Sequence, residues 1–248
     1  MKTHRYVFQY WESKPGTTPP EYLELCDETI RHNCGRDFEI VLLNEKTMFD
    51  WLPGLRTDIL NLKTIAHRAD YIRWKLLYEY GGIWLDRDFI ITKPLIDIYY
   101  FLGDFDFIGC GKILPNILCP SIGFMCANKG FEIGRIQIEK MDEVLSKNFD
   151  AVNSEIGWCA IGTEILRHFI NEHKYLLLPD EYLFPLYWTE YKKFFDETVD
   201  IKKYLVKNNY GFALYNQVFE PWFKSMKKEE ILKSNMPIST LFKKGMGK

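Results

Sequence analysis

The chain has 248 residues, 47% of them hydrophobic and 16% aromatic, which suffices for a sizeable core and excludes a disordered chain. Its 32 basic and 34 acidic residues leave a net charge of -2, so no strong positive field points to nucleic acid as a partner. The length suits one large α/β domain as well as two small ones.

The first part of the chain predicts a strand, a helix and a second strand. Residues 5–10 (RYVFQY) are β-prone, and residues 21–32 have the apolar spacing of a helix that closes at residues 33–35. Residues 38–43 (FEIVLL) predict a buried strand. This order is typical of a parallel sheet whose strand ends carry a ligand site.

The next elements follow from periodicity and glycines. Residues 66–80 carry an apolar stripe at helical spacing, and Gly81 is a natural residue to end that helix. A strand is expected to restart at residues 83–85. Further strands are expected at 105–109, 122–127 and 175–178, and helices at about 131–145 and 162–171. No repeat, linker or low-complexity tract appears, so we expect a single domain over residues 1–248.

The cysteines and the termini bear on the compartment. Six cysteines are scattered without a C-x-x-C pair: Cys26, Cys34, Cys110, Cys119, Cys126 and Cys159. In a chain of this length they favour free, buried thiols of a reducing compartment. No N-terminal apolar stretch and no run of about 18 apolar residues occurs, so we expect a cytoplasmic protein.

Two carboxylates, Asp86 and Asp88, stand between the apolar runs Ile-Trp-Leu and Phe-Ile-Ile. Burying an ionised carboxylate is costly unless it is paired or binds a metal. In an extended segment both side chains project to the same side, where two hard oxygen ligands suit Mg²⁺ or Mn²⁺ together with diphosphate oxygens. The alternative is a turn with solvated acids, which is the commoner meaning of a bare D-x-D.

Asp70 and Arg73 lie one helix earlier, at positions i and i+3 of the same helical face. One interpretation is a surface ion pair without function. The other is a polar edge that faces the same cleft, where the carboxylate accepts hydrogen bonds from sugar hydroxyls and the guanidinium donates them.

The stretch HRADYIRWKLLYEYGGIWLDRDFIITKPL resembles the signature of the DXD-type sugar transferases, A-D-x-x-R-x-x-x-L-x-x-x-G-G-x-[YW]-x-D-x-D followed by x-K-P-L. That group contains the initiation-type α-1,6-mannosyltransferases and the capsular polysaccharide synthesis proteins. The opening Q-Y-W is also similar to that of the capsular proteins. The similarity is dense over residues 64–95, moderate over 5–45 and weak afterwards.

The resemblance implies a GT-A fold, a Rossmann-like α/β fold with a mostly parallel central sheet flanked by helices, which binds a nucleotide-sugar. It implies that Asp88 ligates the metal and that Asp86 binds metal or ribose. It also implies that Asp70 and Arg73 hold the donor sugar and that Trp84 lines the donor pocket. Residues 1–130 would form the nucleotide-sugar-binding part, and residues 131–248 the acceptor side and a basic tail.

Gln9, Tyr10 and Trp11 would lie near the nucleobase, where an aromatic ring can stack; core packing is the alternative for Trp11. In the segment IGWCAIGTEIL (156–166), Thr163 and Glu164 would contact sugars on the acceptor side, or Thr163 would cap a helix.

The chain departs from the family pattern near its end. Relatives of the mannosyltransferase type carry a late A-x-H-H-W-x-x-S-W motif whose histidine approaches the metal. Here the stretch ALYNQVFEPW places Asn216 and Gln217 where the histidines would fall if Trp222 is aligned with the last tryptophan. An amide oxygen still ligates a hard cation, so Asn216 is the candidate third ligand.

The sequence thus predicts a glycosyltransferase that uses Mn²⁺ or Mg²⁺ and moves a hexose from a UDP- or GDP-sugar to a glycan or lipid-linked glycan. By resemblance, the anomeric configuration would be retained. The alternatives are a carbohydrate- or nucleotide-binding module that has lost catalysis, and a nucleotidyltransferase or phosphohydrolase that uses the same aspartates.

The basic C-terminal stretch suggests a peripheral membrane contact. Lysines near an anionic leaflet contribute about 1 kcal/mol each. Apolar residues that would add a shallow membrane face are Trp222, Phe223, Met226, Ile231, Leu232 and Leu241. The alternative is a solvated, partly frayed terminus.

Overall fold

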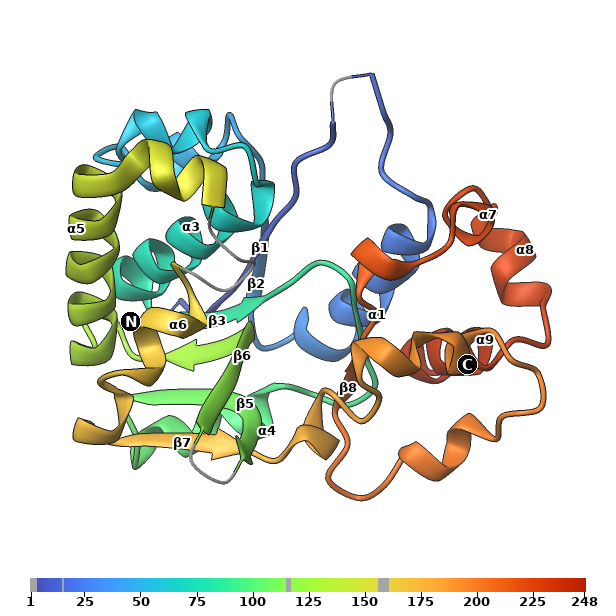
Figure 1. Cartoon of the computed structure of the whole chain (residues 1–248). Helices are drawn as coiled ribbons and strands as arrows, with labels where there is room; N and C mark the ends of the chain where they lie inside the picture. Colours follow the sequence, from blue (N-terminus) through green and yellow to red (C-terminus); the bar gives the residue numbers. More distant parts are fainter. Residues whose placement is uncertain (1–3, 15, 115–116, 156–160) are drawn as a thin grey trace. The chain divides into compact units, whose positions relative to one another are not determined.

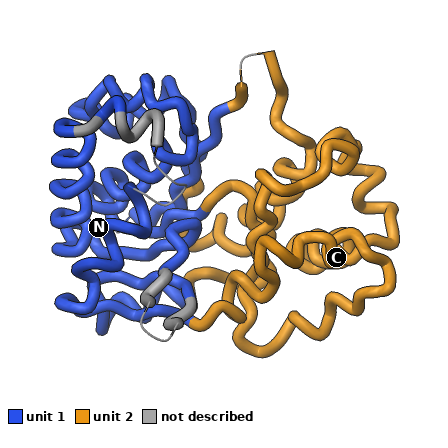
Figure 2. The backbone as a smooth tube through the Cα atoms, in the orientation of Figure 1, with its two compact units in different colours: residues 1–12, 41–85, 98–178 blue, residues 13–40, 86–97, 179–248 orange. Residues whose placement is uncertain are grey.

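The structure, a computed structural model, describes residues 4–14, 16–114, 117–155 and 161–248 (Figure 1). The chain forms two compact units, each built from separate segments of the sequence (Figure 2). The first unit contains residues 1–12, 41–85 and 98–178, and the second unit contains residues 13–40, 86–97 and 179–248.

A six-stranded sheet forms the centre of the first unit. Its strands, in spatial order, are β2 (Glu39–Leu43), β1 (Tyr6–Tyr10), β3 (Gly82–Leu85), β6 (Ile117–Ala127), β5 (Phe107–Leu114) and β7 (Tyr175–Leu178). Strand β1 runs parallel to β3, and β5 runs parallel to β7. Strand β6 is antiparallel to both of its neighbours, so it is reversed within an otherwise parallel row from β1 to β7. The predicted mostly parallel sheet is therefore confirmed.

Helices cover this sheet. Helix α3 (Ile65–Tyr80) packs against β1, β3 and β6 and against the long helix α5 (Glu132–Glu155), and α6 (Thr163–Arg167) packs against β6 (Figure 1). The core between α3, β5 and α5 includes the stacked rings of Trp74, Phe107 and Phe131. A short helix, α2 (Met48–Trp51), precedes α3 in the chain.

Gly81 and Gly82 make the turn from α3 into β3. Both have positive φ, 68° and 102°, where a side chain is strained. A Cβ at Gly81 would lie 2.6 Å from the Lys129 backbone nitrogen, and one at Gly82 would lie 2.6 Å from the Tyr6 carbonyl oxygen. The predicted role of Gly81 in ending the helix is confirmed, and the strand can pack closely because both residues lack a side chain.

The second unit is built around helix α1 (Tyr22–Cys34) and a two-stranded antiparallel sheet of β4 (Phe89–Ile91) and β8 (Gly211–Ala213). Helix α1 packs against β4, α8 (Lys228–Lys233) and α9 (Pro237–Gly245). Helix α7 (Pro221–Lys224) also belongs to this unit, and α4 (Ile96–Tyr99) begins in its residues and ends in those of the first unit. Several 3-10 turns connect these elements, including residues Trp188–Phe194.

The cysteines and the lengths of the helices bear on predictions made from the sequence. Cys26, Cys34, Cys110 and Cys126 are free and buried, as predicted; Cys159 and the side chain of Cys119 lie outside what the structure describes. Among the helices of the described ranges, none combines the length and the apolarity that a membrane crossing needs.

The apolar membrane face predicted for the C-terminal stretch is contradicted for three of its six residues. Phe223, Ile231 and Leu241 are fully buried, because α7, α8 and α9 belong to the core of the second unit. The alternative of a frayed terminus was wrong for the same reason. Two of the lysines form ion pairs with α1 or the residue before it: Lys227 with Glu21 at 2.7 Å and Lys228 with Glu24 at 2.8 Å.

Truncation of the chain after Glu220 is therefore expected to unfold the second unit. It would remove five fully buried apolar side chains: Phe223, Ile231, Ile238, Leu241 and Phe242. Each such side chain contributes about 1.5–3 kcal/mol, and their sum reaches the whole stability of a typical domain, roughly 5–15 kcal/mol. Urea unfolding should show the loss, whereas a chain that lacks only the exposed Lys248 should unfold like the full chain. A cooperative, wild-type transition in the truncated chain would contradict the assignment.

Candidate active site

The D-x-D segment lies between two strands that belong to different sheets. Strand β3 ends at Leu85, the chain bends at Arg87 and Asp88, and β4 begins at Phe89. The extended path assumed from the sequence is therefore interrupted, and the alternation that would place both carboxylates on one side does not apply across the bend. Asp86 and Asp88 are half-buried, which leaves their oxygens within reach of a ligand.

The bend is anchored to the rest of the second unit by three contacts. Arg87 binds Asp27 of α1 through two nitrogens, with Nε to Oδ1 at 3.1 Å and Nη2 to Oδ2 at 2.7 Å. The Asp88 carbonyl oxygen accepts the backbone N–H of Leu214 at 2.9 Å, and Asp88 Oδ2 accepts the backbone N–H of Asn216 at 2.7 Å. A bidentate, mostly buried arginine–carboxylate pair fixes orientation as well as charge, so Arg87 and Asp27 hold the bend in place.

Tyr215, next to Asn216, has a left-handed backbone with φ 56° and ψ 58°, and it is the sole non-glycine residue with positive φ in the described ranges. Such a conformation costs about 1–2 kcal/mol for a residue with a side chain. Its hydroxyl donates to the Leu186 carbonyl oxygen at 2.8 Å, which helps to hold it. Strained backbone of this kind concentrates at functional sites, and here it lies next to Asn216, whose backbone N–H donates to Asp88.

Tyr22 of α1 contacts Asn216 from the other side. Its hydroxyl donates to Asn216 Oδ1 at 2.5 Å. Burial raises the pKa of Tyr22 well above 10, and the nearby Asp88 raises it further. The hydroxyl therefore stays protonated and keeps donating. Asn216 Oδ1 retains a second lone pair, so its role as a metal ligand stays a prediction.

A Tyr22→Phe variant tests this arrangement through its pH dependence. Because the folded-state pKa of Tyr22 lies above the unfolded value of 10.0, the hydroxyl stabilises the fold fully below pH 10 and loses this contribution as pH rises above 10. Between about pH 10 and 11 the free energy of unfolding of the wild type should fall more steeply than that of the variant, by up to about 1.4 kcal/mol per pH unit. Urea titrations measure both slopes. The exposed Tyr187→Phe is the matched control, and equal slopes in wild type and Tyr22→Phe would contradict the assignment.

Lys224 interacts electrostatically with Asp88, which the sequence did not reveal. Burial lowers the pKa of its ammonium group and Lys14 lowers it further, while Asp88 and Glu220 act in the opposite direction. These interactions place a half-buried cation in the electrostatic neighbourhood of Asp88. In the sequence Lys224 belongs to the basic C-terminal stretch, and nothing local links it to an aspartate so far away in the chain.

Asp70 and Arg73 form a buried ion pair in the first unit, 3.2 Å apart, and both side chains are only 6% exposed. Arg73 also donates to the carbonyl oxygens of Ala69, at 3.2 Å, and Ile122. Its guanidinium carbon lies 4.9 Å from the centre of the Trp84 ring. The interpretation as a surface pair was wrong. The structure brings Asp70, Arg73 and Trp84 together, whereas their roles toward a donor sugar stay predictions.

Gln9, Tyr10 and Trp11 follow one another at the end of β1. Gln9 is 1% exposed, and its Nε2 has no hydrogen-bond partner in the described part of the chain. Tyr10 is buried and donates to Glu12 at 2.9 Å, and Trp11 is half-buried. A buried donor without a partner is costly, about 1–3 kcal/mol, and is often explained by a missing ligand or water. Nucleobase binding by these residues remains a prediction.

Thr163 does not cap α6. Its hydroxyl donates to the Pro120 carbonyl oxygen at 3.1 Å and so ties α6 to β6. Glu164 forms an exposed ion pair with Arg167 at 2.6 Å. Residues 156–160 of the segment predicted to lie near the acceptor are outside the described residues.

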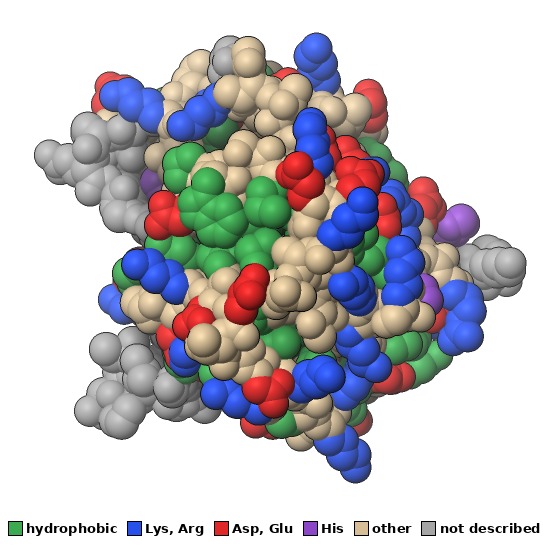
Figure 3. Space-filling model, turned by 90° about the vertical axis from the view of Figure 1, so that its right-hand side faces the viewer, with side chains coloured by type: hydrophobic (Ala, Val, Ile, Leu, Met, Phe, Trp, Pro, Cys, Tyr) green, Lys and Arg blue, Asp and Glu red, His purple; other side chains and the backbone are tan. Residues whose placement is uncertain are grey.

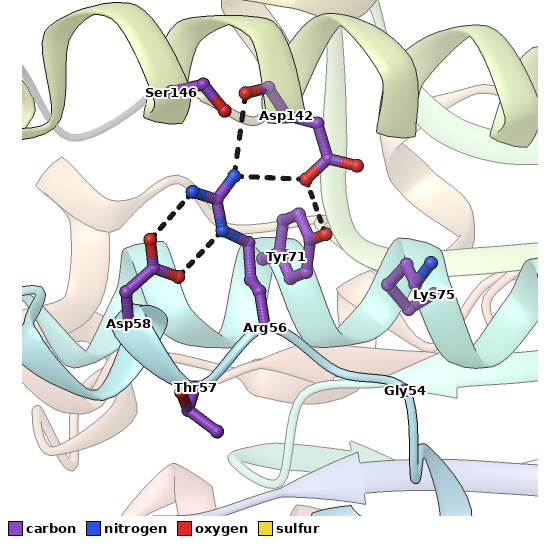
Figure 4. Close-up of a pocket in the computed structure, with 8 residues that line it drawn as sticks. All are labelled: Gly54, Arg56, Thr57, Asp58, Tyr71, Lys75, Asp142 and Ser146. Atoms are coloured by element: carbon purple, nitrogen blue, oxygen red, sulfur yellow. Dashed lines mark hydrogen bonds and ion pairs between the residues drawn. The ribbon is translucent and has the colours of Figure 1, made fainter.

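Figure 4 shows a polar pocket of the first unit. Arg56 binds Asp58 through two nitrogens at 2.7 Å each, and it binds Asp142 at 3.1 Å. The hydroxyl of Tyr71 donates to the same Asp142 oxygen at 2.6 Å. These bonds tie the segment before α3 to α5 and join Arg56 to two carboxylates, so packing explains the arrangement of these three side chains.

The comparisons with known proteins concern a segment of the chain and the fold. Residues 20–106 match a family model described as a glycosyltransferase sugar-binding region containing a DXD motif. This segment includes Asp70, Arg73, Asp86 and Asp88. Among curated proteins, none matches the chain.

Two solved structures share the fold. A galactosyltransferase, LgtC, solved with donor and acceptor sugar analogues, has a TM-score of 0.53 at 14% identity over 96% of this chain and 95% of that one. The glycosyltransferase GlyE of Streptococcus pneumoniae TIGR4 has a TM-score of 0.51 at 17% identity over 99% of this chain. The present chain spans 64% of the length of GlyE.

The chain therefore has the GT-A fold. Within it, residues 20–106 match the DXD-containing sugar-binding region of glycosyltransferases, in agreement with the resemblance to the DXD-type sugar transferases.

Proposed function

We propose that this chain is a glycosyltransferase that moves a hexose from a nucleoside diphosphate sugar to a hydroxyl of a glycan or glycolipid, with a divalent cation and with retention of configuration. The observation that carries the proposal is the anchored, half-buried Asp86–Asp88 bend inside the matched region. The fold shared with LgtC, a protein solved with donor and acceptor sugar analogues, supports a reaction with two substrates. Synthesis of a polysaccharide or glycoconjugate in the cytoplasm is the expected setting.

The donor atoms at the bend fit Mn²⁺ or Mg²⁺. In the described ranges no three His, Cys, Asp or Glu side chains gather into a metal-binding cluster, and the candidate charged ligands are the two aspartates of the bend. Mg²⁺ commonly binds through one or two carboxylates, and substrate phosphates and water complete its shell. Asp86 and Asp88 would hold the cation, with the amide oxygen of Asn216 as the candidate third ligand. A bound cation would neutralise charge on the diphosphate as the nucleotide leaves.

The chain's own residues supply position and charge for the reaction. The Arg87–Asp27 pair holds the bend, and the backbone N–H of Asn216 fixes the Asp88 carboxylate before a substrate arrives, which lowers the cost of ordering it. Lys224 adds a cation near Asp88, where the negative charge of a diphosphate would collect. Asp70 and Arg73 would orient donor-sugar hydroxyls.

The proposal is tested with a panel of UDP- and GDP-sugars and the purified chain. Donor hydrolysis, transfer to oligosaccharide acceptors and protection against melting are measured with Mn²⁺, with Mg²⁺ and with a chelator. We expect one nucleotide to protect the protein only with a cation, and one of its sugars to be transferred. Full activity in chelator would overturn the metal dependence.

The same experiment separates the alternatives. Metal-dependent nucleotide binding without turnover of any donor would favour a binding module. Cleavage of the diphosphate itself, without release or transfer of sugar, would favour a phosphohydrolase. Analysis of the anomeric form of the product decides retention.

A further inference from the structure

Exposed apolar side chains are gathered among charged ones on the face drawn in Figure 3. The large exposed apolar residues of the second unit are Tyr187, Trp188, Val206 and Trp222. One of them lines a groove of about 420 Å³, whose lining is half aromatic and half charged: Tyr191, Lys192, Phe195, Asp196, Glu220 and Trp222. We call it the aromatic groove.

The indole of Trp222 is exposed and yet fixed in place. It is 49% exposed, and other rings contact it edge to face: Phe195 at 5.3 Å with an interplanar angle of 69°, and Phe223 at 5.8 Å with 79°. These contacts hold the ring while leaving much of its surface in solvent. A fixed aromatic surface loses little conformational entropy on binding, because its rotamer is set beforehand.

The charged side chains of the groove can form hydrogen bonds with a ligand. Glu220 accepts the hydroxyl of Tyr191 at one oxygen, at 2.8 Å, which positions the carboxylate and leaves its other oxygen lone pairs for further donors. Lys192 and Asp196 are exposed at the rim. A sugar ring has C–H groups on its faces and hydroxyls around its edge, so it needs an aromatic surface and a surrounding set of donors and acceptors.

The aromatic groove is joined to the Asp86–Asp88 bend through the core of the second unit. The ring of Phe223 contacts those of Trp222 and Tyr22, at 5.8 and 5.3 Å between ring centres. The Tyr22 hydroxyl in turn donates to the side chain of Asn216, and the backbone N–H of Asn216 donates to Asp88. Lys224, the next residue after Phe223, interacts with both Glu220 and Asp88. A glycan held in the groove would therefore be held by the same compact unit that contains the two aspartates.

We propose that the aromatic groove binds a sugar ring of the acceptor glycan, stacked on Trp222 and hydrogen-bonded by Glu220. This proposal deepens the proposed function. It rests on that function only in identifying the bound glycan as the acceptor of the transfer reaction. The binding itself is a property of the groove and can be tested without any donor.

The test compares two exposed tryptophans of the same unit. Trp222→Ala removes the stacking surface, and Trp188→Ala, at a 60% exposed residue outside the groove lining, is the matched control. The full chain and both variants are probed with an array of neutral and acidic oligosaccharides and, in solution, with the best-bound one. We expect Trp222→Ala to weaken that binding by about tenfold or more and Trp188→Ala to leave it unchanged.

Further readouts distinguish the proposal from its rivals. Glu220→Gln, which keeps the shape of the side chain, should also weaken glycan binding, and the melting shift with UDP or GDP and Mn²⁺ should be the same in every variant. Absence of glycan binding, equal effects of the two tryptophan changes, or Trp222-dependent binding to lipid vesicles in place of glycans would each overturn the proposal. If Trp222-dependent glycan binding is found in a protein that turns over no donor, the groove is confirmed as a sugar site and the proposed transfer reaction fails.

Discussion

Replacement of Asp88 by Asn is expected to lower the rate of sugar transfer by at least about a hundredfold while the fold survives. The change keeps the size of the side chain, and the amide oxygen can still accept the backbone N–H of Asn216. It removes one of the two negative charges proposed to hold the cation. Loss of one group that stabilises a developing charge commonly costs about a hundredfold to a thousandfold in rate.

The measurement is a transfer assay at saturating donor over a range of Mn²⁺ concentrations. The variant should also need more Mn²⁺ to reach its residual rate. Asp104→Asn, the same change at an exposed residue, should behave as wild type, and melting curves should match for all three proteins. Normal Mn²⁺-dependent turnover by Asp88→Asn would contradict the assignment of the metal site.

Replacement of Arg73 by Ala should destabilise the first unit by about 3–5 kcal/mol. The reason is the buried Asp70 carboxylate, which would lose its ion-pair partner in a place where water cannot replace it. Urea unfolding measures the change. Arg135→Ala is the matched control, because Arg135 has two acidic partners, Glu132 and Glu139, at the surface of α5, and its loss should change stability little. Equal effects of the two changes would show that the Asp70–Arg73 pair contributes no more than a surface pair.

Arg73→Lys separates stability from function. Lysine keeps the positive charge beside Asp70 but lacks the planar group that donates to Ile122 and lies over Trp84. We expect it to keep most of the stability and to lower the transfer rate more than the affinity for the nucleotide. An unchanged rate at saturating donor would confine Arg73 to a structural role.

The sequence was most informative where one short stretch determines both shape and chemistry. The two glycines before β3 predicted the end of α3, and positive φ at both positions explains why no other residue serves there. The spacing of Asp86 and Asp88 predicted their chemistry but not their geometry. An apolar run on each side of them indicated one strand, whereas each run belongs to a separate sheet, a difference that hydrophobic periodicity cannot distinguish.

Contacts between distant segments could not be predicted. Nothing near Arg87 in the sequence points to Asp27, and nothing near Tyr22 points to Asn216, because each pair meets only after the second unit has assembled. The C-terminal lysines and apolar residues gave a misleading signal for a related reason. Their composition suits a surface that binds membranes, but the helices they form bury Phe223, Ile231 and Leu241 in the core of the second unit.

The interleaving of the two compact units has a consequence for protein engineering. Each unit is assembled from three stretches of chain, and the sugar-binding region of residues 20–106 contributes to both. A hybrid enzyme made by joining two homologues at a single crossover, for example near residue 130, would build the sheet of the first unit from strands of both parents. Donor and acceptor preferences are therefore better exchanged by transplanting individual side chains, such as those of the aromatic groove, than by recombining contiguous gene fragments.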